Sequence, residues 1–460
     1  MLNDNLTREA ASFPSGAHTE LRAQKNRTRR VTLLSGNLVA NTRTDLSGVS
    51  ARVYKNGAWG FSSTADDSPE AVRAVLKAAS DNAAFLDSHI RKGRPALPTL
   101  PRSERPLEGD IEDADQKTYI DFARALDDKL TGYKNIVSRR VVIHEDSMEK
   151  LLRVSSGMNG HTISPRSYCY VFLTAETPQG MPAELFTVAG GEGTFRQNFS
   201  DPALLLPQVD DLYEKVMQKR EGVYADAGEK TVILGGMMTG MLSHEAVGHT
   251  VEADLVLGGS VASHCLGQPV ASPLVTMTDF AHTAFGQQAP LPVYVDDEGT
   301  PARDVTLIQN GVLVGYMNSV ETARRFSMEP GGNARAWLFS DEPLIRMRNT
   351  AIHPGTDKLE DMIASVDDGY YLLNSGNGQA DTTGEFMFGV TMGYEIKKGK
   401  LGRALLDTTV SGVAFQMLKT VDMVSDTVTW ASSGFCGKKQ PMAVSMGGPA
   451  LRCRITIGGR

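Results

Sequence analysis

The residues with the clearest capacity for chemistry lie in the segment SHEAVGHTVEAD at 243–254. There His244, Glu245 and His249 form an H-E-x-x-x-H pattern, which places two imidazoles, both good metal ligands, beside a carboxylate. On a straight helix, residues five positions apart lie about 140° from each other around the axis, so they cannot reach the same metal. Gly248 directly precedes His249 and weakens the helix, which makes an unwound or bulged turn physically reasonable. The pattern predicts a metal site on a distorted helix.

A hydrolytic site of this kind needs one more protein ligand. Zinc in such sites takes three protein donors and leaves its fourth position to water. The residues alone leave several donors open: Glu252, Asp254, Asp296, Asp297, Glu298, Cys436 and Cys453. For the DDEG cluster at 296–299, a polar turn before a strand expected at 305–308 is the simpler interpretation. Asp254 and Glu252 could instead accept a hydrogen bond from a ligand histidine and so orient its ring, without binding the metal themselves.

The elements that precede this segment predict two α+β units. The first, residues 1–90, is expected to hold a hairpin and one helix. Its hairpin is predicted from alternating residues at 29–38 and 49–54, followed by the turn residues Asn56-Gly57 before Trp59-Gly60-Phe61, and its helix from Ser68-Pro69 to about Leu86. The segment 91–110 carries four prolines and many charges, so it is interpreted as a linker.

The second unit, residues 111–224, is expected to be a middle α+β domain. Its predicted helices lie at 115–130 and 204–217, and its predicted antiparallel strands at 137–144, 151–155, 168–175 and 183–189. From about residue 225 the glycine content rises and strands and loops dominate, so a third, β-rich domain carrying the metal helix is predicted at 225–460. The expected fold is therefore α+β and multidomain.

Composition excludes some classes of function. The chain has 460 residues, a net charge of −7 and a pI near 5.8, which gives no electrostatic reason to bind DNA directly. The longest apolar run, 232–242, contains three glycines and is far shorter than the ~20 residues of a membrane helix. Four scattered cysteines and an N-terminus without the pattern of a signal peptide favour the cytoplasm.

The segment HEAVGHTVEAD closely resembles the metal-binding segment of the TldD/PmbA family, whose members are described as peptidases and as modulators of DNA gyrase. The likeness continues in VDDEGTPARDVTLIQNGVLVGYM (295–317), GGNARA (331–336), RMRNTAIHPG (346–355), DTTGEFMFGVTMGYEIKKGK (381–400) and CGKKQPMAVSMGGPALR (436–452). SGVSARVYKNGAWGFSST (47–64) resembles the family's N-terminal hairpin. The chain is identified as a member of the TldD-like branch, which keeps H-E-x-x-x-H.

The resemblance implies roles for individual residues. The two histidines and a cysteine in a C-G-K segment hold zinc in the active branch, which implies His244, His249 and Cys436, and the glutamate matches Glu245. Two imidazoles and a thiolate leave zinc one open site for water, and Glu245 would take that water's proton and return it to the leaving amine. Within F-C-G-K, Gly437 would let the backbone turn close to the metal, and Lys438 and Lys439 would keep the thiol ionised.

The chain departs from the family pattern after the proposed cysteine. A segment of the type G-Q-x-V-P-V-G-x-G-Q-P is replaced by KQPMAVSMGGP at 439–449, which is one residue shorter and puts the geometry of the cysteine in question. Cys453 is extra and, in a strand-like run, is interpreted as a buried strand residue.

The resemblance also implies substrates and partners. We expect hydrolysis of unfolded or flexible peptides, and a dimer formed either with a second copy or with a relative that lacks the motif. The alternatives are a catalytically silent peptide-binding subunit and, against the acidic net charge, a DNA gyrase regulator.

Overall fold

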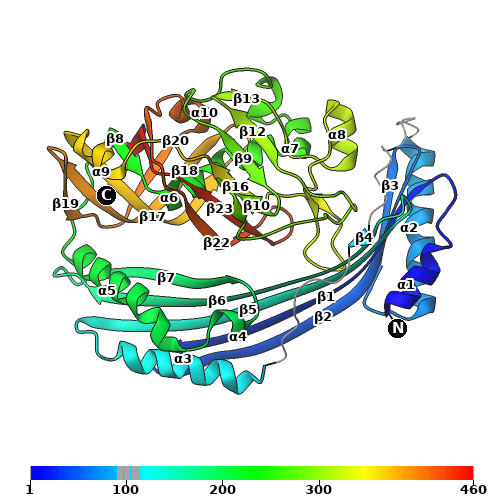
Figure 1. The fold of residues 1–460 in the computed structure, drawn as a ribbon, viewed down its shortest axis with the longest axis horizontal. Helices are drawn as coiled ribbons and strands as arrows, with labels where there is room; N and C mark the ends of the chain where they lie inside the picture. The colour runs from blue at the N-terminus through cyan, green and yellow to red at the C-terminus, as the bar shows by residue number, and fades with distance from the viewer. Residues whose placement is uncertain (1, 91–96, 98–103, 106–113, 459–460) are drawn as a thin grey trace.

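A long curved sheet carries a more compact C-terminal half on its concave face (Figure 1). The structure is a computed structural model that describes residues 2–90, 97, 104–105 and 114–458. Most of the linker predicted at 91–110 lies outside the described residues. The mixed α+β class predicted from the sequence is confirmed.

The long sheet combines strands from both of the units predicted before residue 225. Its path is β3-β2-β1-β5-β6-β4, and β7 pairs with β6. The strands are β1 (His18–Leu34), β2 (Asn37–Lys55), β3 (Ala58–Thr64), β4 (Glu104–Arg105), β5 (Ile136–Val154), β6 (Asn159–Glu176) and β7 (Pro182–Glu192). Because β1 pairs with β5 along its length, the predicted first and middle domains share one sheet.

Two strands predicted in the middle unit are in fact one continuous strand. Residues 137–144 and 151–155 were expected to be two strands, but both lie within the single 19-residue strand β5. The polar residues between them suggest a turn, yet they are paired on both sides within the sheet, and Glu145 and Asp146 are buried. Asp146, for example, accepts a hydrogen bond from Arg166 at 2.6 Å. Partners that lie far away in the sequence thus allow a charged stretch to remain a strand.

Local signals in the N-terminal half produce the elements they predict. Asn56 and Gly57 both have positive φ, 50° and 97°, as a two-residue hairpin turn between β2 and β3 requires. Ser68 Oγ accepts from Ala71 N at the start of α2 (Pro69–Ile90). Asp115 caps α3 (Gln116–Leu130) by accepting from Lys117 N. The predicted turn at Asn56-Gly57 and both of these helices are confirmed, but the strand expected at 29–38 is wrong, because a turn at Ser35-Gly36 divides it between β1 and β2.

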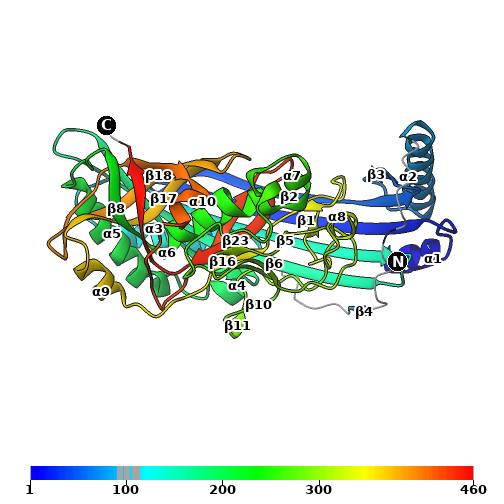
Figure 2. The same cartoon turned by 90° about the horizontal axis from the view of Figure 1, so that it is seen from above.

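Helices cover the sheet away from the C-terminal half (Figures 1 and 2). Toward the N-terminal end, α1 (Leu2–Ala10) and α2 enclose one apolar cluster, while α3, α4 (Phe195–Asn198) and α5 (Leu206–Arg220) enclose a second. A short 3₁₀ turn, Pro202–Leu205, leads into α5. The helix predicted at 204–217 is confirmed with a later end.

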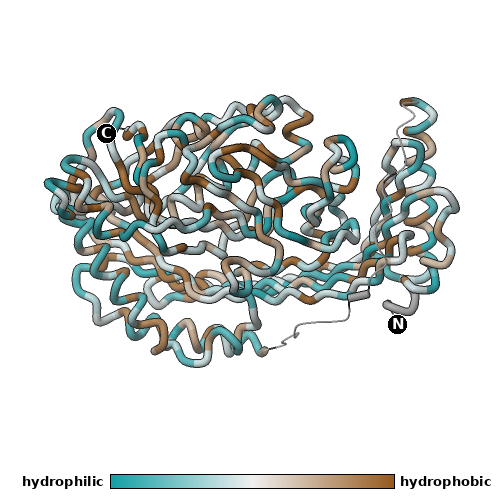
Figure 3. Tube along the Cα trace, turned by 45° about the horizontal axis from the view of Figure 1, so that its top comes forward, coloured by the Kyte–Doolittle hydropathy of each residue, from teal (hydrophilic) through white to brown (hydrophobic). Residues whose placement is uncertain are grey.

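The C-terminal half contains two larger sheets. The first has the path β17-β8-β24-β20-β18-β19, with β21 beside β24 and an additional pairing of β17 with β18 that closes a small barrel. Its strands are β8 (Gly228–Leu234), β17 (Asp368–Ala380), β18 (Glu385–Lys397), β19 (Lys400–Ala404), β20 (Thr408–Val413), β21 (Met423–Val424) and β24 (Leu451–Ile457). Figure 3 shows hydrophobic residues concentrated among the strands of this half.

The second sheet has the path β13-β12-β9-β16-β23-β22. Its strands are β9 (Met277–Phe280), β12 (Val305–Gln309), β13 (Val312–Leu313), β16 (Asn349–Ile352), β22 (Thr429–Cys436) and β23 (Met442–Gly448). Two small hairpin pairs accompany it, β10 (Thr283–Ala284) with β11 (Gln287–Gln288) and β14 (Ala334–Arg335) with β15 (Leu344–Ile345). The remaining helices are α6 (Gly236–Met241), α7 (Ala253–Leu257), α8 (Val320–Phe326), α9 (Leu359–Ala364) and α10 (Ala414–Leu418).

Buried ion pairs join the long sheet to the C-terminal half. Lys150 of β5 contacts both carboxylate oxygens of Asp297 at 2.9 and 2.6 Å. Arg52 of β2 donates to Glu298 at 2.7 Å. All four side chains are at least 85% buried, so removing either member of a pair would leave a charge without compensation. Within the described residues, no helix is long and apolar enough to cross a membrane.

Candidate metal centre

The two histidines lie on a π-helical turn. After α6 the chain continues as a π-helix over Leu242–Gly248 and then as a 3₁₀ turn over His249–Val251. The backbone N–H of His249 donates to the carbonyl of His244, five residues earlier, so one wide turn separates them. Their ring centroids are 5.1 Å apart. The distorted turn predicted from the five-residue spacing is confirmed.

The structure requires glycine at position 248 because of limited space, and not because of the backbone flexibility that was expected from the sequence. Its φ and ψ, −53° and −50°, are ordinary helical values. A Cβ atom there would lie 2.1 Å from Met347 Sδ and 2.9 Å from the carbonyl oxygen of Ser243. The wider π-turn presses this position against Met347, so the glycine supplies space rather than backbone freedom.

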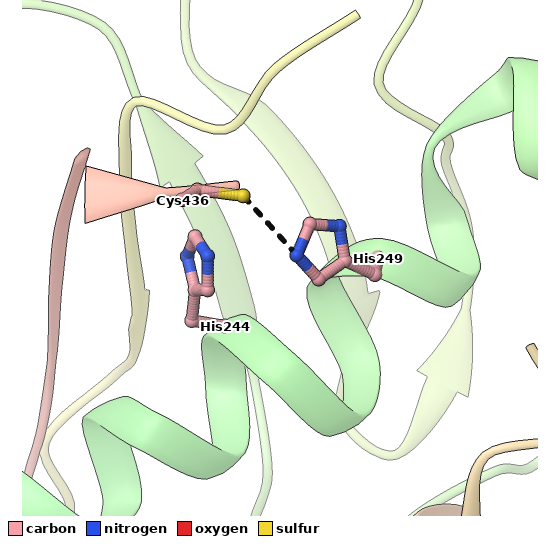
Figure 4. Close-up of side chains that lie close together, drawn as sticks. All are labelled: His244, His249 and Cys436. Atoms are coloured by element: carbon pink, nitrogen blue, oxygen red, sulfur yellow. Dashed lines mark hydrogen bonds between the residues drawn. The ribbon is translucent and has the colours of Figure 1, made fainter. Parts of the chain in front are cut away.

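Cys436 meets the two histidines from the end of β22. Its Sγ lies 3.3 Å from Nε2 of His249, and the candidate ligand atoms of His244, His249 and Cys436 all lie within 4.8 Å of one another (Figure 4). Among the described residues this is the one group of three or more histidine, cysteine or acidic side chains suited to a metal. Neither ring nitrogen of buried His244 has a hydrogen-bond partner there. Buried imidazole nitrogens without a hydrogen-bond partner are suited to binding a metal.

The charges around the sulfur favour a thiolate. Burial alone would raise the pKa of Cys436, but His244 and His249 outweigh it and lower that pKa to about 4. Burial alone would lower the pKa of His249, but Glu252 and Cys436 raise it to about 10. A metal binding here would find the sulfur already ionised and would displace a proton from His249.

A buried carboxylate orients one histidine. Oε2 of Glu252, which is fully buried, lies 2.7 Å from Nδ1 of His249 and leaves Nε2 facing Cys436. Lys438 Nζ lies 3.2 Å from Glu252 and 2.9 Å from Asp254. Asp254 thus contacts this lysine rather than a histidine. Lys438 neutralises these acids, and the two histidines rather than the lysines lower the pKa of Cys436.

Glu245 lies across both rings. Its Oε1 is 4.0 Å from Nε2 of His244, and its Oε2 is 3.7 Å from Nε2 of His249. The side chain keeps 27% of its surface exposed, more than that of either histidine. The carboxylate is therefore accessible to solvent and lies beside both histidines, where a proton acceptor is useful.

The other candidate ligands lie elsewhere. Asp296 accepts from the backbone N–H groups of Glu298 and Thr300, so the DDEG segment forms the expected turn, although its acids are buried and face the long sheet. Cys453 lies in β24, where burial raises its pKa to about 12, and its interpretation as a buried strand residue is confirmed.

Sequence reasoning missed a residue that holds the cysteine segment. The buried guanidinium of Arg346 donates to the carbonyl oxygens of Cys436 at 2.7 Å, Lys438 at 2.9 Å and Gln440 at 2.7 Å. Arg346 begins the segment RMRNTAIHPG, whose resemblance to the TldD/PmbA family was the one feature of the sequence that could have indicated its importance. Gly437 does not have the expected role, because its φ is not positive and a Cβ there would meet nothing within 4 Å.

Two protein-family models and several known proteins are similar in sequence to this chain. The model of the PmbA/TldA metallopeptidase C-terminal domain matches residues 227–459, and that of domain 1 matches residues 19–83. A metalloprotease of Methanothermobacter thermautotrophicus is 30% identical over 453 residues, covering 96% of this chain and 95% of that protein. A zinc metalloprotease TldD homolog of Saccharolobus solfataricus is 32% identical over 251 residues, covering 54% and 56%.

Solved structures show the same fold. TldE from Thermococcus kodakarensis has a TM-score of 0.75 at 18% identity and covers all of both chains. A protein described as a modulator of a DNA gyrase from Thermotoga maritima has a TM-score of 0.77 at 19% identity, covering 98% of this chain and 99% of that one. The sequence matches over nearly the whole chain carry the conclusion that this protein belongs to the PmbA/TldA metallopeptidase family.

Proposed function

We propose that the chain is a zinc-dependent peptidase that hydrolyses unfolded or flexible peptides. The observation that carries the proposal is the convergence of His244, His249 and Cys436 with Glu245 at the exposed side. Two imidazoles and a thiolate are the donor set that zinc favours, and they leave room for a fourth ligand. The partnerless ring nitrogens of His244 fit the same assignment.

Each residue has a separate task. Zinc bound here would polarise a peptide carbonyl and make a bound water more acidic. Glu245 takes a proton from the attacking water and returns it to the leaving amine, since its two oxygens face both ligand histidines. Glu252 holds His249 with Nε2 toward the metal position, and Arg346 holds the segment that carries Cys436.

The edge of β22 suits an extended substrate. This strand ends the six-stranded sheet and carries Cys436 at its last position. Its neighbour Phe435 is 43% exposed. The carbonyl oxygens of Ser432 and Ser433 accept from the hydroxyls of Tyr168 and Tyr170, so a peptide would add at the end of the strand near Phe435. An unfolded peptide can pair there through main-chain hydrogen bonds that any sequence provides, whereas a folded protein cannot offer such a strand.

Zinc analysis combined with a cleavage assay tests this function. We expect about one zinc per chain, cleavage of a polypeptide in its unfolded form but not in its folded form, loss of cleavage with a chelator, and recovery on adding zinc. Cleavage that ignores the chelator would overturn the mechanism. Zinc binding without cleavage of any unfolded polypeptide would instead indicate a silent binding subunit.

We further propose that the chain pairs with a second copy or with a motif-lacking relative along β2. Within the described residues, β3 covers only Val49–Lys55 of this strand, so residues 37–47 pair on one side alone. Val39 and Leu46 on this open edge are 57% and 44% exposed. Light scattering at micromolar concentration should show a dimer for the chain and a monomer for Val39→Lys, because a charge blocks edge pairing. A dimer in both would place the contact elsewhere.

A further inference from the structure

A second site adjoins the metal centre. A cavity of about 270 Å³ lies between the long sheet and the C-terminal half. The sheet contributes Lys150, Leu152 and Arg166 to its lining. The C-terminal half contributes Asp297, Arg335 and Met442, and its Leu291 and Val293 form an apolar wall with Leu152. Figure 1 shows this part of the C-terminal half lying over the long sheet.

Two of the three cations in the lining are neutralised. Lys150 contacts both oxygens of Asp297 at 2.9 and 2.6 Å, and Arg166 donates to Asp146 at 2.6 Å. The acids of the lining are also satisfied: Glu192 accepts from Gln288, and Asp296 accepts from the backbone N–H groups of Glu298, Thr300 and Ala334.

Arg335 is the exception. It is 9% exposed, and its one hydrogen bond in the described part of the chain runs from Nη1 to the carbonyl of Met347 at 2.8 Å. Among the described residues it forms no ion pair, and Asp297 and Asp279 act on its charge without contacting it. Its pKa is lowered to about 9, mainly by burial and then by Arg166 and Arg346, which Asp297 and Asp279 offset only in part. A buried guanidinium without a carboxylate in contact is costly, and an anion entering the cavity would relieve that cost.

Two residues of the cavity lining are linked by contacts to the metal centre. Met442 in its lining pairs directly with Cys436 across β22 and β23, so the two side chains lie on the same face, with Cβ atoms about 5 Å apart. Arg335 also bonds Met347, whose Sδ packs against Gly248 of the metal-binding turn. The lining of the cavity therefore lies one side chain away from the metal ligands.

We propose that this cavity is a substrate subsite in which Arg335 binds a carboxylate of the peptide. The donor groups left free on a planar guanidinium match a carboxylate in bidentate geometry, and the apolar wall accommodates the methylene groups that lead to it. The proposal rests on the proposed peptidase function. The carboxylate belongs either to an aspartate or glutamate side chain or to the free C-terminus of the peptide, and these two sources share the same chemistry.

Matched peptides test the subsite. One series replaces a glutamate by glutamine at successive positions around the cleaved bond, and a second compares free with amidated C-termini. We expect kcat/KM to be roughly tenfold higher for the peptide whose carboxylate reaches Arg335, the size of one charge-assisted hydrogen bond. Arg335→Gln should erase the preference between the charged and the neutral peptide, and Arg335→Lys should keep part of it. The series that responds identifies the source of the carboxylate.

Binding separates this proposal from the peptidase function. Fluorescence anisotropy of the same labelled peptides measures affinity whether or not they are cleaved. Equal affinity and equal cleavage of charged and neutral peptides by the unaltered chain would overturn the subsite even if both variants failed to fold. An equal loss on all peptides in a folded Arg335→Gln variant would also overturn it and indicate a structural role. If nothing is cleaved but the carboxylate peptide binds more tightly, the peptidase function fails and the subsite stands.

Discussion

Glu252 Oε2 lies 2.7 Å from His249 Nδ1, and this carboxylate is fully buried. The contact fixes which nitrogen of the ring faces Cys436, and its negative charge makes the imidazole a better donor. Glu252→Gln should therefore weaken zinc binding about 10- to 100-fold. Competition against a fluorescent chelator measures this change.

Asp254→Asn is the matched control, because Asp254 contacts Lys438 and not a histidine. We expect a smaller loss of zinc affinity in that variant. Equal losses in the two variants would mean that the general charge around Lys438, rather than the orientation of His249, supports the site.

Glu245→Gln should retain zinc and lose hydrolysis. The amide preserves the shape of the side chain but cannot accept a proton from water, so we expect kcat to fall by about 10² to 10⁴. Zinc content and cleavage of an unfolded polypeptide are measured on the same preparation. Loss of zinc would instead make Glu245 a ligand, and full activity would remove it from the mechanism.

Gly248→Ala should disturb the π-turn. The added Cβ would lie 2.1 Å from Met347 Sδ, and overpacking of this kind costs about 1–3 kcal/mol of unfolding free energy. Zinc affinity should fall as well, because the turn that unites His244 with His249 must shift. Urea unfolding and zinc titration report the two effects.

Gly437→Ala is the control for this change. It also lies beside a candidate ligand, but a Cβ there meets nothing within 4 Å, so both stability and zinc affinity should stay near those of the unaltered chain. Stronger damage at Gly437 than at Gly248 would contradict the steric explanation.

The sequence predicted the irregular turn but not the length of β5, and the reason is the range of the interactions. The five-residue spacing of His244 and His249 is local and already requires a non-α turn. The charged middle of β5 depends on partners far away, such as Asp297, which lies 147 residues from Lys150. Nothing near Lys150 reveals that partner. The role of Arg346 could not be predicted for a similar reason, because the segment that it binds lies about ninety residues later in the sequence.

Asp297→Asn should lower the free energy of unfolding by about 3 kcal/mol at neutral pH, because Lys150 and Arg22 keep their buried charges without a counter-charge. Burial would raise the pKa of Asp297, but Lys150 and Arg22 outweigh it and lower that pKa. A carboxylate with a lowered folded-state pKa stabilises the protein above its unfolded pKa of about 4 and loses this contribution as pH falls further.

Urea unfolding at several pH values checks this prediction. The difference between the unaltered chain and the variant should shrink below about pH 4. A difference that does not change with pH would indicate a packing effect, and no difference at neutral pH would show that this pair does not hold the C-terminal half to the long sheet.

The choice between Cys436 and Cys453 is the sharpest remaining test, because the segment after Cys436 departs from the family pattern. Cys436 lies beside both histidines, and its pKa is lowered to about 4. Cys453 is enclosed in β24, where burial raises its pKa to about 12 and keeps it a neutral thiol. A metal ligand must be the thiolate, so only Cys436 is ready to bind.

Cys436→Ser should lower zinc occupancy and abolish cleavage, since an alcohol is a far weaker zinc donor than a thiolate. Cys453→Ser should leave zinc occupancy and cleavage nearly unchanged and lower stability only modestly. The reverse result would show that the shortened segment does not hold Cys436 where the structure places it.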